Sequence, residues 1–596
     1  LNVIALISGG KDSFFSILHC IANGHKIVAL ANLHPPQPED GPTPDDIDSY
    51  MYQTVGHGII PLYAEALQLP LYRQDITGGA VRTERDYRYV GRDPDWGTDK
   101  ERLKKTKEEV DETEDLVPLL KKIKEAYPEA NAVSTGAILS TYQRTRVESV
   151  ALRVGLVPFS YLWQYPFLPP YQQSRLLFDM AAVGLDARII KTASGGLDES
   201  FVWSNVADAK TIMRLQKAMG RFGESGVGAV LGEGGEFETL VVDGPNLLKC
   251  LLVEEGDWTT ISSGGSSIWK SKQATLASKD DTDDKALEHL RKPELWDVEF
   301  YDVLETLVNL PNVHSNTQSE IQSPWQNSIF MRNFDRTRIS LTPSTIVVPN
   351  LTHHRDTNPD DPADPGTQMQ FILSHLISQI GMHNEDSDLT PENIIHITLL
   401  LRDMSSFAEV NNVYSQILMM ANPPSRVTVA CGNALPDGVD VMLSAIVSRT
   451  KKEGLHVQSR SYWAPANIGP YSQAISVPLQ PLTTSSEAAD RPGPQAVYVA
   501  GQIPLVPASM EMYMKYGFKG QTALALQHLW RIGRATNVRW WTAGVAYISS
   551  ATWTCSTEEA VLAAQTAWKA IHNSTLKPTD TTEEEEEDID PWDAKN

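Results

Sequence analysis

The stretch Ser8-Gly9-Gly10-Lys11-Asp12-Ser13 lies between an apolar run at residues 3–7 and an apolar helical pattern at residues 14–18. The first run is typical of a short buried strand, and the second suits a helix packed on that strand. Two glycines let the backbone turn sharply, so several N–H groups can converge on an anion at the helix N-terminus. The serine hydroxyls add donors, and the lysine adds a positive charge. The stretch predicts a phosphate-binding loop, but not a Walker A loop, which has four residues between its first glycine and Gly-Lys-Ser/Thr.

Short apolar runs and helical patterns alternate through the first 250 or so residues. Strands are expected at residues 26–30, 71–74 and 132–134, and helices at 54–69 and 100–125. This alternation predicts an α/β fold with a parallel sheet and helices on both of its faces. Ligands bind such sheets at the carboxyl ends of the strands, where the loop at residues 8–13 and Gly136 would both lie. The dense mixed charges of the last helix predict a solvated surface.

The length and composition of the chain exclude several classes of protein. A chain of 596 residues suggests about three or four domains. The balance of 51 Lys+Arg against 75 Asp+Glu gives a net charge of −24, which argues against a chain that wraps nucleic acid. Four scattered cysteines indicate neither a zinc site nor a disulfide framework. No apolar run reaches the ~18 residues of a membrane span, and no signal peptide is recognised, so we expect a cytoplasmic protein.

Two further stretches carry groups that suit a binding site. Residues 136–148 follow a predicted strand and contain Arg144 and Arg146, which suit bidentate contact with phosphate or carboxylate. An ion pair between Arg144 and Glu148, four residues apart on a helix, is the structural alternative. Residues 232–240 place three glycines among Glu233, Glu236 and Glu238, a composition that favours a loop close to a ligand over a core strand.

These motifs resemble known families. The loop at residues 8–13 resembles the pyrophosphate-binding loop of the adenine-nucleotide α-hydrolase superfamily, which cleaves ATP between the α and β phosphates. Together with residues 51–57 and the two stretches above, in this order, it resembles the diphthine–ammonia ligase family over about residues 1–250. The resemblance implies ATP, Mg²⁺ and ammonia as reactants, and elongation factor two bearing diphthine as the protein partner. It implies amide formation through an acyl-adenylate, with release of AMP and pyrophosphate.

The predicted roles follow this chemistry. The nucleotide site comprises Ser8, Gly9, Gly10, Lys11, Asp12, Ser13 and Gly136. The catalytic candidates are Lys11 and Asp12, with Asp12 as Mg²⁺ ligand, and Arg144 and Arg146, which steer the carboxylate. The substrate-binding candidates are Tyr142, Glu233, Glu236 and Glu238. Of these, Glu236 and Glu238 are expected to face the trimethylammonium of diphthine, together with an aromatic side chain such as Tyr142 or Trp163.

Beyond about residue 255 the composition and the apolar periodicity of the sequence change. We expect an amidation domain at 1–255, a linker at 256–324, Rid-like domains at 325–450 and 458–575, and an acidic tail at 576–596. The last two domains resemble the α+β Rid (YjgF-like) fold, which usually forms trimers, so self-association is possible. Arg426 matches the family's carboxylate-binding arginine, but Met442 stands where its glutamate would be. The expectation is therefore two folding and assembly modules rather than a deaminase, with ammonia delivery or docking of the protein substrate as the alternative role. The second copy lacks a recognisable Pro-x-Arg strand, so it is either incomplete or divergent.

Two other functions stay open on the sequence alone. One is a pyrophosphate-loop enzyme that modifies tRNA. The acidic composition disfavours it, because a negatively charged chain repels the phosphates of a nucleic acid, and no direct nucleic-acid binding is expected. The other is a non-catalytic nucleotide-sensing scaffold, which the presence of Lys11 and Asp12 disfavours. No membrane partner is expected.

Overall fold

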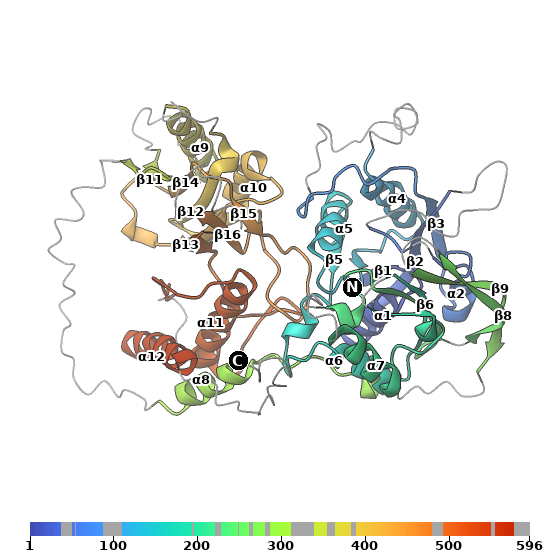
Figure 1. Cartoon of the computed structure of the whole chain (residues 1–596). Coiled ribbons are helices and arrows are strands. Elements are labelled where there is room, and N and C mark those ends of the chain that lie inside the picture. The colour runs from blue at the N-terminus through green and yellow to red at the C-terminus, as the bar shows by residue number, and fades with distance from the viewer. Residues whose placement is uncertain are drawn as a thin grey trace, which may run out of the picture. The chain divides into compact units, whose positions relative to one another are not determined.

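A computed structural model gives the fold (Figure 1). It describes residues 1–36, 51–53, 55–87, 110–193, 196–220, 228–247, 249–261, 266–279, 286–310, 339–353, 364–382, 389–479, 493–549 and 555–576. The chain divides into two compact units. Unit 1 comprises residues 1–295, 334–501 and 506–510, and unit 2 comprises 296–333, 502–505 and 511–596. Among the described helices, none combines the length and apolar character needed to cross a membrane.

Unit 1 begins with the predicted parallel sheet, in the strand order β3-β2-β1-β4-β5. Its strands are β1 (Asn2–Leu6), β2 (Lys26–His34), β3 (Leu71–Asp75), β4 (Ala132–Ser134) and β5 (Val157–Phe159). Its helices are α1 (Lys11–Ala22), α2 (Leu62–Leu67), α4 (Leu116–Ala126) and α5 (Thr141–Arg153). The α/β prediction is confirmed. The strand order reverses between β1 and β4, so the loops after these two strands flank one crevice.

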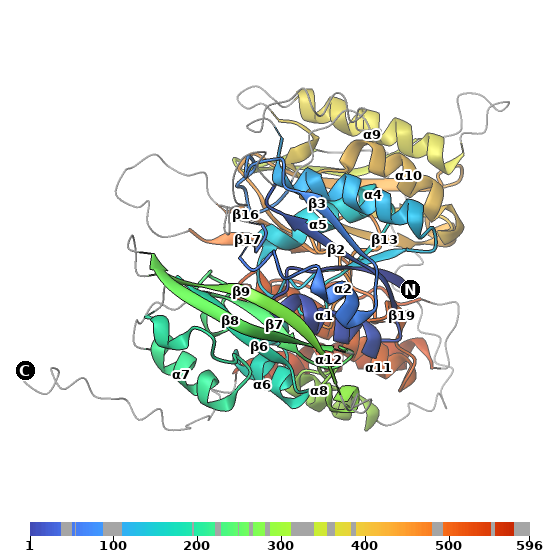
Figure 2. The same cartoon turned by 90° about the vertical axis from the view of Figure 1, so that its right-hand side faces the viewer.

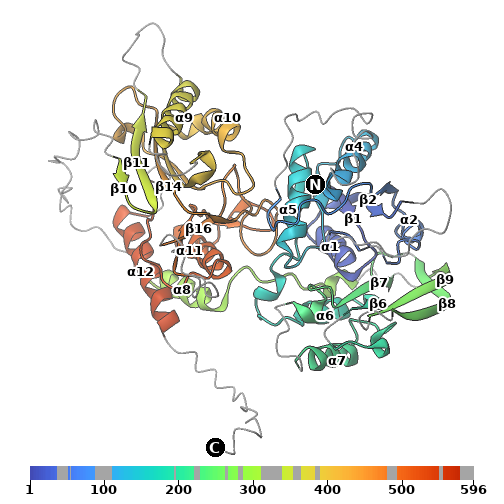
Figure 3. The ribbon, with the colours of Figure 1, turned by 45° about the horizontal axis from the view of Figure 1, so that its top comes forward.

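Helices cover both faces of this sheet (Figure 3). Ile4 of β1 packs into a core with the apolar sides of α4 and α5. Its neighbours Val3 and Ala5 are also fully buried, and alternation along a strand places them on the opposite face, where α1 packs. The solvated-helix prediction holds for one side of α4 only. The acidic residues just before it, 111–115, are buried.

A four-stranded antiparallel sheet follows, in the order β7-β6-β9-β8 (Figure 2). Its strands are β6 (Asp186–Thr192), β7 (Phe237–Asp243), β8 (Lys249–Ile261) and β9 (Ser266–Ser278), and α6 (Arg175–Ala182) and α7 (Ala209–Gly220) accompany them. The linker prediction is wrong for residues 256–278, because most of them form the β8–β9 hairpin. An antiparallel pair with one wet face tolerates polar residues, so the low apolar content of this stretch did not exclude strands.

The Rid-like part of unit 1 forms a five-stranded sheet in the order β10-β11-β14-β12-β13. Its elements are β10 (Ser340–Leu341), β11 (Thr345–Thr352), α9 (Pro365–Met382), β12 (Ile394–Leu401), α10 (Phe407–Leu418), β13 (Ser425–Ala430) and β14 (Val441–Ser448). The two helices share a continuous apolar core with β11, β12 and β14. This is the α+β arrangement that the sequence predicted for residues 325–450.

The stretch predicted as the second Rid-like copy differs from the first copy in its described residues. In unit 1 this stretch contributes β16 (Ala474–Pro478) and β17 (Gln495–Val499). β16 lies between β15 (Glu453–Leu455) and β17 and pairs with both. The next strands are β18 (Leu505–Val506) and β19 (Glu511–Met512). In unit 2, α11 (Gly517–Ala535) and α12 (Thr557–Leu576) pack with α8 (Val298–Val308). Among the described residues 536–549 no strand follows α11, whereas β12 follows α9 in the first copy. Most of the acidic tail, residues 577–596, lies outside the described residues.

Candidate active site

The predicted phosphate loop connects β1 to α1 at the carboxyl edge of the parallel sheet. Gly9 has a φ of +87°, which other residues rarely adopt, and a Cβ there would lie 2.7 Å from Ile60. Hydroxyl oxygens hold the loop amides: Ser13 Oγ accepts from Ser8 N at 3.4 Å, and Ser8 Oγ accepts from Gly10 N at 3.3 Å. Such long bonds are easily exchanged for a phosphate oxygen, so the loop has the geometry of an anion cradle.

Lys11 and Asp12 form an ion pair at the start of α1. Lys11 Nζ lies 2.7 Å from Asp12 Oδ2, and the lysine is buried, with 4% of its side chain exposed. The other oxygen of Asp12, Oδ1, is buried and has no hydrogen-bond partner among the described residues. Burial raises the pKa of Asp12, although Lys11 opposes this shift. The carboxylate therefore has one oxygen available to a further cation.

Strand β7 of the second sheet borders the loop. Val241 N donates to Gly9 O at 2.8 Å, and Lys11 N donates to Thr239 Oγ1 at 3.0 Å. Gln53 Nε2 donates to Thr239 O at 2.9 Å, which ties the polar stretch at residues 51–57 to the same place. Sequence reasoning missed Thr239 and Gln53 as loop partners, although both belong to motifs that it had singled out.

Gly136 follows β4 and faces the loop directly. A Cβ at this position would lie 2.7 Å from the backbone carbonyl carbon of Asp12 and 2.8 Å from Ser13 N. Only a glycine permits this approach without a backbone shift, so the turn after β4 and the start of α1 are packed against each other. The sequence prediction that these two segments share one edge is confirmed.

Glu233 lies in the glycine-rich loop that precedes β7. Its Oε2 accepts a hydrogen bond from Leu139 N, in the turn after β4, at 2.9 Å. Burial and the nearby charge of Asp12 raise the pKa of Glu233 to about 7. Two segments distant in sequence therefore bring the charges of Lys11, Asp12 and Glu233 close enough to influence one another.

The other two carboxylates of that loop are held separately. Glu236 Oε2 accepts from Gly234 N at 2.9 Å, within its own turn. Glu238 pairs with Lys191 Nζ at 3.1 Å, so its charge is already compensated. The cation-binding role of Glu238 stays a prediction, and the pair with Lys191 weighs against it.

The steering role predicted for the two arginines of α5 is also wrong, because both are fully buried. Arg144 pairs with Glu148 at 2.7 Å and stacks 4.4 Å from the centre of the Trp163 ring, so the ion-pair alternative is confirmed. Arg146 donates to the carbonyls of Arg82 and Tyr142 and lies 3.2 Å from the centre of the Tyr142 ring.

The position of Arg146 also affects Tyr142. One face of that ring is covered by the guanidinium, so it is not open to a trimethylammonium group. Both arginines serve the packing of α5. The substrate-binding role predicted for Tyr142 is wrong for this covered face.

The arginine predicted in the Rid-like part is buried as well. Arg426 donates to Asn411 Oδ1 at 2.9 Å and lies against the rings of Tyr414 and Tyr471. Met442 is a buried residue of β14 and offers no acid–base group.

Comparison with known proteins relates three ranges of the chain to known families. Family models described as "Diphthamide synthase N-terminal domain" and "Diphthamide synthase C-terminal domain" match residues 1–88 and 173–273, and "Endoribonuclease L-PSP" matches 360–448. A diphthine–ammonia ligase of Schizosaccharomyces pombe is 36% identical over 556 residues, which are 92% of this chain and 80% of that protein. This chain belongs to the diphthine–ammonia ligase family. The Saccharomyces cerevisiae diphthine–ammonia ligase is 33% identical over 562 residues, 89% of this chain and 72% of that protein.

A shorter relative matches less than half of this chain. The human diphthine–ammonia ligase is 43% identical over 259 residues, which are 43% of this chain and 84% of that protein. This length is close to that of the part matched by the two diphthamide synthase models. As a member of the family the chain is a C–N ligase.

Proposed function

We propose that this chain uses ATP and ammonia to convert the carboxylate of diphthine on elongation factor two into the amide of diphthamide. The observation that carries the proposal is the loop at residues 8–13, which lies at the point where the order of the parallel strands reverses. Membership of the diphthine–ammonia ligase family supports the choice of substrate. The two diphthamide synthase family models, which match residues 1–88 and 173–273, support assigning the chemistry to the N-terminal half.

A carboxylate and ammonia form a salt rather than an amide, because oxide is too poor a leaving group. Attack of the carboxylate on the α-phosphate of ATP forms an acyl-adenylate and breaks the bond to pyrophosphate. Ammonia then attacks the acyl carbon, loses a proton, and AMP departs. The protein has to align these groups and to stabilise the negative charge of the departing pyrophosphate. We assign that stabilisation to Lys11 and the N–H groups of the loop.

The residues around the loop are compatible with Mg²⁺. Asp12 Oδ1 is a buried carboxylate oxygen without a hydrogen-bond partner among the described residues. No cluster of three or more His, Cys, Asp or Glu side chains fit to hold a metal occurs in the described part of the chain. A single carboxylate suits Mg²⁺, which keeps most of its waters and binds substrate phosphates. Bound there, the ion would neutralise phosphate charge beside Lys11.

Glu236 is the residue that we assign to the trimethylammonium group of diphthine. Its charge is compensated by no lysine or arginine among the described residues, whereas Glu238 is paired with Lys191. Glu233, which interacts with Asp12, belongs in this proposal to the nucleotide end of the site.

The test supplies the purified chain with ATP, Mg²⁺, ¹⁵N-ammonium and elongation factor two that carries diphthine. We expect ¹⁵N in the modified histidine and one AMP for each amide formed. AMP release that requires tRNA, or no AMP release with any of these substrates, would refute the proposal.

A further inference from the structure

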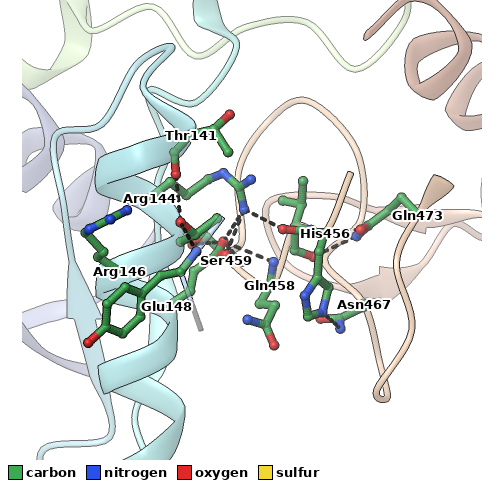
Figure 4. Close-up of polar contacts among 12 residues, drawn as sticks. Thr141, Arg144, Arg146, Glu148, His456, Gln458, Ser459, Asn467 and Gln473 are labelled. Atoms are coloured by element: carbon green, nitrogen blue, oxygen red, sulfur yellow. Dashed lines mark hydrogen bonds and ion pairs between the residues drawn. The ribbon is translucent and has the colours of Figure 1, made fainter. Parts of the chain in front are cut away.

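A buried carboxylate of the ligase half binds a segment of the chain more than 300 residues away (Figure 4). Glu148 Oε1, on α5, accepts from Gln458 N at 3.0 Å, from Ser459 N at 2.8 Å and from Ser459 Oγ at 2.7 Å. Both Glu148 and Ser459 are fully buried. We call residues 456–462 the strap.

Arg144 extends the same contact. Its Nη1 donates to both oxygens of Glu148 and to His456 O, at 2.7–2.8 Å. A buried ion pair needs further hydrogen bonds to compensate the lost hydration. The strap supplies them to Glu148 Oε1 and Arg144 Nη1, whereas Arg144 Nε and Nη2 are buried without a hydrogen-bond partner among the described residues. Loss of the strap would leave Glu148 with Arg144 alone among these partners.

The strap also reaches the edge of the parallel sheet and the helix that follows the phosphate loop. Arg460 N donates to Pro158 O at 3.0 Å, and Ser160 N donates to Arg460 O at 2.9 Å, so the strap makes a one-residue parallel bridge with β5. The Tyr462 hydroxyl lies 2.9 Å from His19 Nδ1 and accepts from Asn23 Nδ2 at 2.6 Å. His19 lies on α1 and Asn23 directly follows it.

The other side of the strap is fixed to the Rid-like part. His456 Nδ1 lies 2.8 Å from Ala421 O, and Asn467 Nδ2 lies 3.0 Å from His456 Nε2. Gln473 donates from Nε2 to Val457 O at 2.6 Å and accepts from Val457 N at 2.8 Å. The strap is therefore held between the Rid-like part and the two helices, α1 and α5, that begin at the nucleotide site.

We propose that Glu148 is a positioning residue of the ligase site and acts through the strap. It holds α5 and, at the N-terminal end of that helix, the turn that contains Gly136 and Leu139. Gly136 abuts the backbone of Asp12, and Leu139 N binds Glu233, so the position of α5 sets the geometry of both carboxylates. The effect of Glu148 on amide formation rests on the proposed function, because that function names the substrate. Its effect on ATP binding does not depend on which substrate is amidated.

The test measures ATP binding by calorimetry, and kcat and KM for amide formation, with the full chain. Ser459→Ala removes one donor to Glu148 and leaves the backbone, so we expect a folded protein that binds ATP about fivefold more weakly, the effect of one lost hydrogen bond. Glu148→Gln is expected to weaken ATP binding more than about tenfold. The double variant is expected to bind ATP no more weakly than Glu148→Gln, because both changes remove the same contact.

The matched control is Ser444→Ala, which removes a hydroxyl bonded to Asn350 inside the Rid-like sheet and is expected to leave ATP binding unchanged. Tyr462→Phe replaces Glu148→Gln if the latter does not fold, with the same expected direction. Parent-like ATP affinity and kcat in folded Ser459→Ala and Tyr462→Phe, with only a lower melting temperature, would overturn the proposal. If the parent binds ATP but forms no amide, the proposed function fails, while the ATP affinities still decide the role of Glu148.

Discussion

Gly136→Ala is the substitution whose effect on the site follows most directly from geometry. The added Cβ would lie 2.7 Å and 2.8 Å from backbone atoms of Asp12 and Ser13, where ordinary contacts begin at 3.4 Å. Both neighbours are backbone, so neither can rotate away, and the turn after β4 and the start of α1 have to separate by about half an ångström or more. Gly136 has no positive φ, so the effect is steric rather than conformational.

The expected consequences are a loss of stability and a larger loss of activity. Overpacking of this kind costs about 1–3 kcal/mol of the free energy of unfolding. The displaced groups include the backbone that carries Asp12, and misplacement on this scale lowers kcat/KM for ATP by about 10- to 100-fold.

Urea denaturation measures the first effect, and AMP release under varied ATP measures the second. Gly220→Ala, at the end of α7, is the matched control, because a Cβ there meets nothing within 4 Å and stability should not fall. If Gly136→Ala keeps kcat/KM for ATP within about twofold of the parent, the close packing does not set the site.

Three further outcomes are expected. Lys11→Ala should lower kcat by about 10²–10³ without unfolding the protein, measured as AMP release beside circular dichroism; near-normal turnover would remove Lys11 from the mechanism. The pKa of Glu233 is raised to about 7, so its ionisation destabilises the nucleotide-free fold as pH rises from about 4.5 to above 7. Glu233→Gln should therefore be more stable than the parent at pH 8 but not at pH 4.5, by urea denaturation; an equal effect at both pH values contradicts the shift. Glu236→Gln should raise KM for the protein substrate more than KM for ATP; the reverse order would assign Glu236 to the nucleotide.

The parts of the site that were predictable depend on local chemistry. The loop at residues 8–13 was recognisable because its glycines, lysine and serines are adjacent in sequence and lie between a strand and a helix. Gly136 was predictable for a topological reason, since adjacent parallel strands end at the same edge of a sheet. Both predictions could be made without information on which side chains pack around the loop or around Gly136.

Apart from the polar hairpin that was predicted as a linker, the errors concern partners that come from elsewhere in the chain. Arg144 is suited to binding phosphate, and nothing near it in sequence shows that Trp163 and the strap enclose it. Arg146 is likewise enclosed by the carbonyl groups of a loop more than 60 residues earlier. The acidic run at residues 111–115 was expected at a solvated surface but is buried, with Arg153 paired to Glu114. Charge and helical periodicity report what a residue prefers, and tertiary packing decides whether it is exposed.

The strap has a consequence for the order of events during synthesis. His456 is 312 residues later in the chain than Arg144, whose guanidinium it contacts. At ~5–20 residues per second, a ribosome takes roughly 15–60 s to add that length. Throughout this interval the emerging ligase half contains a guanidinium–carboxylate pair that lacks its backbone partners. The hydrogen bonds between the strap and the ligase half can therefore form only late in translation.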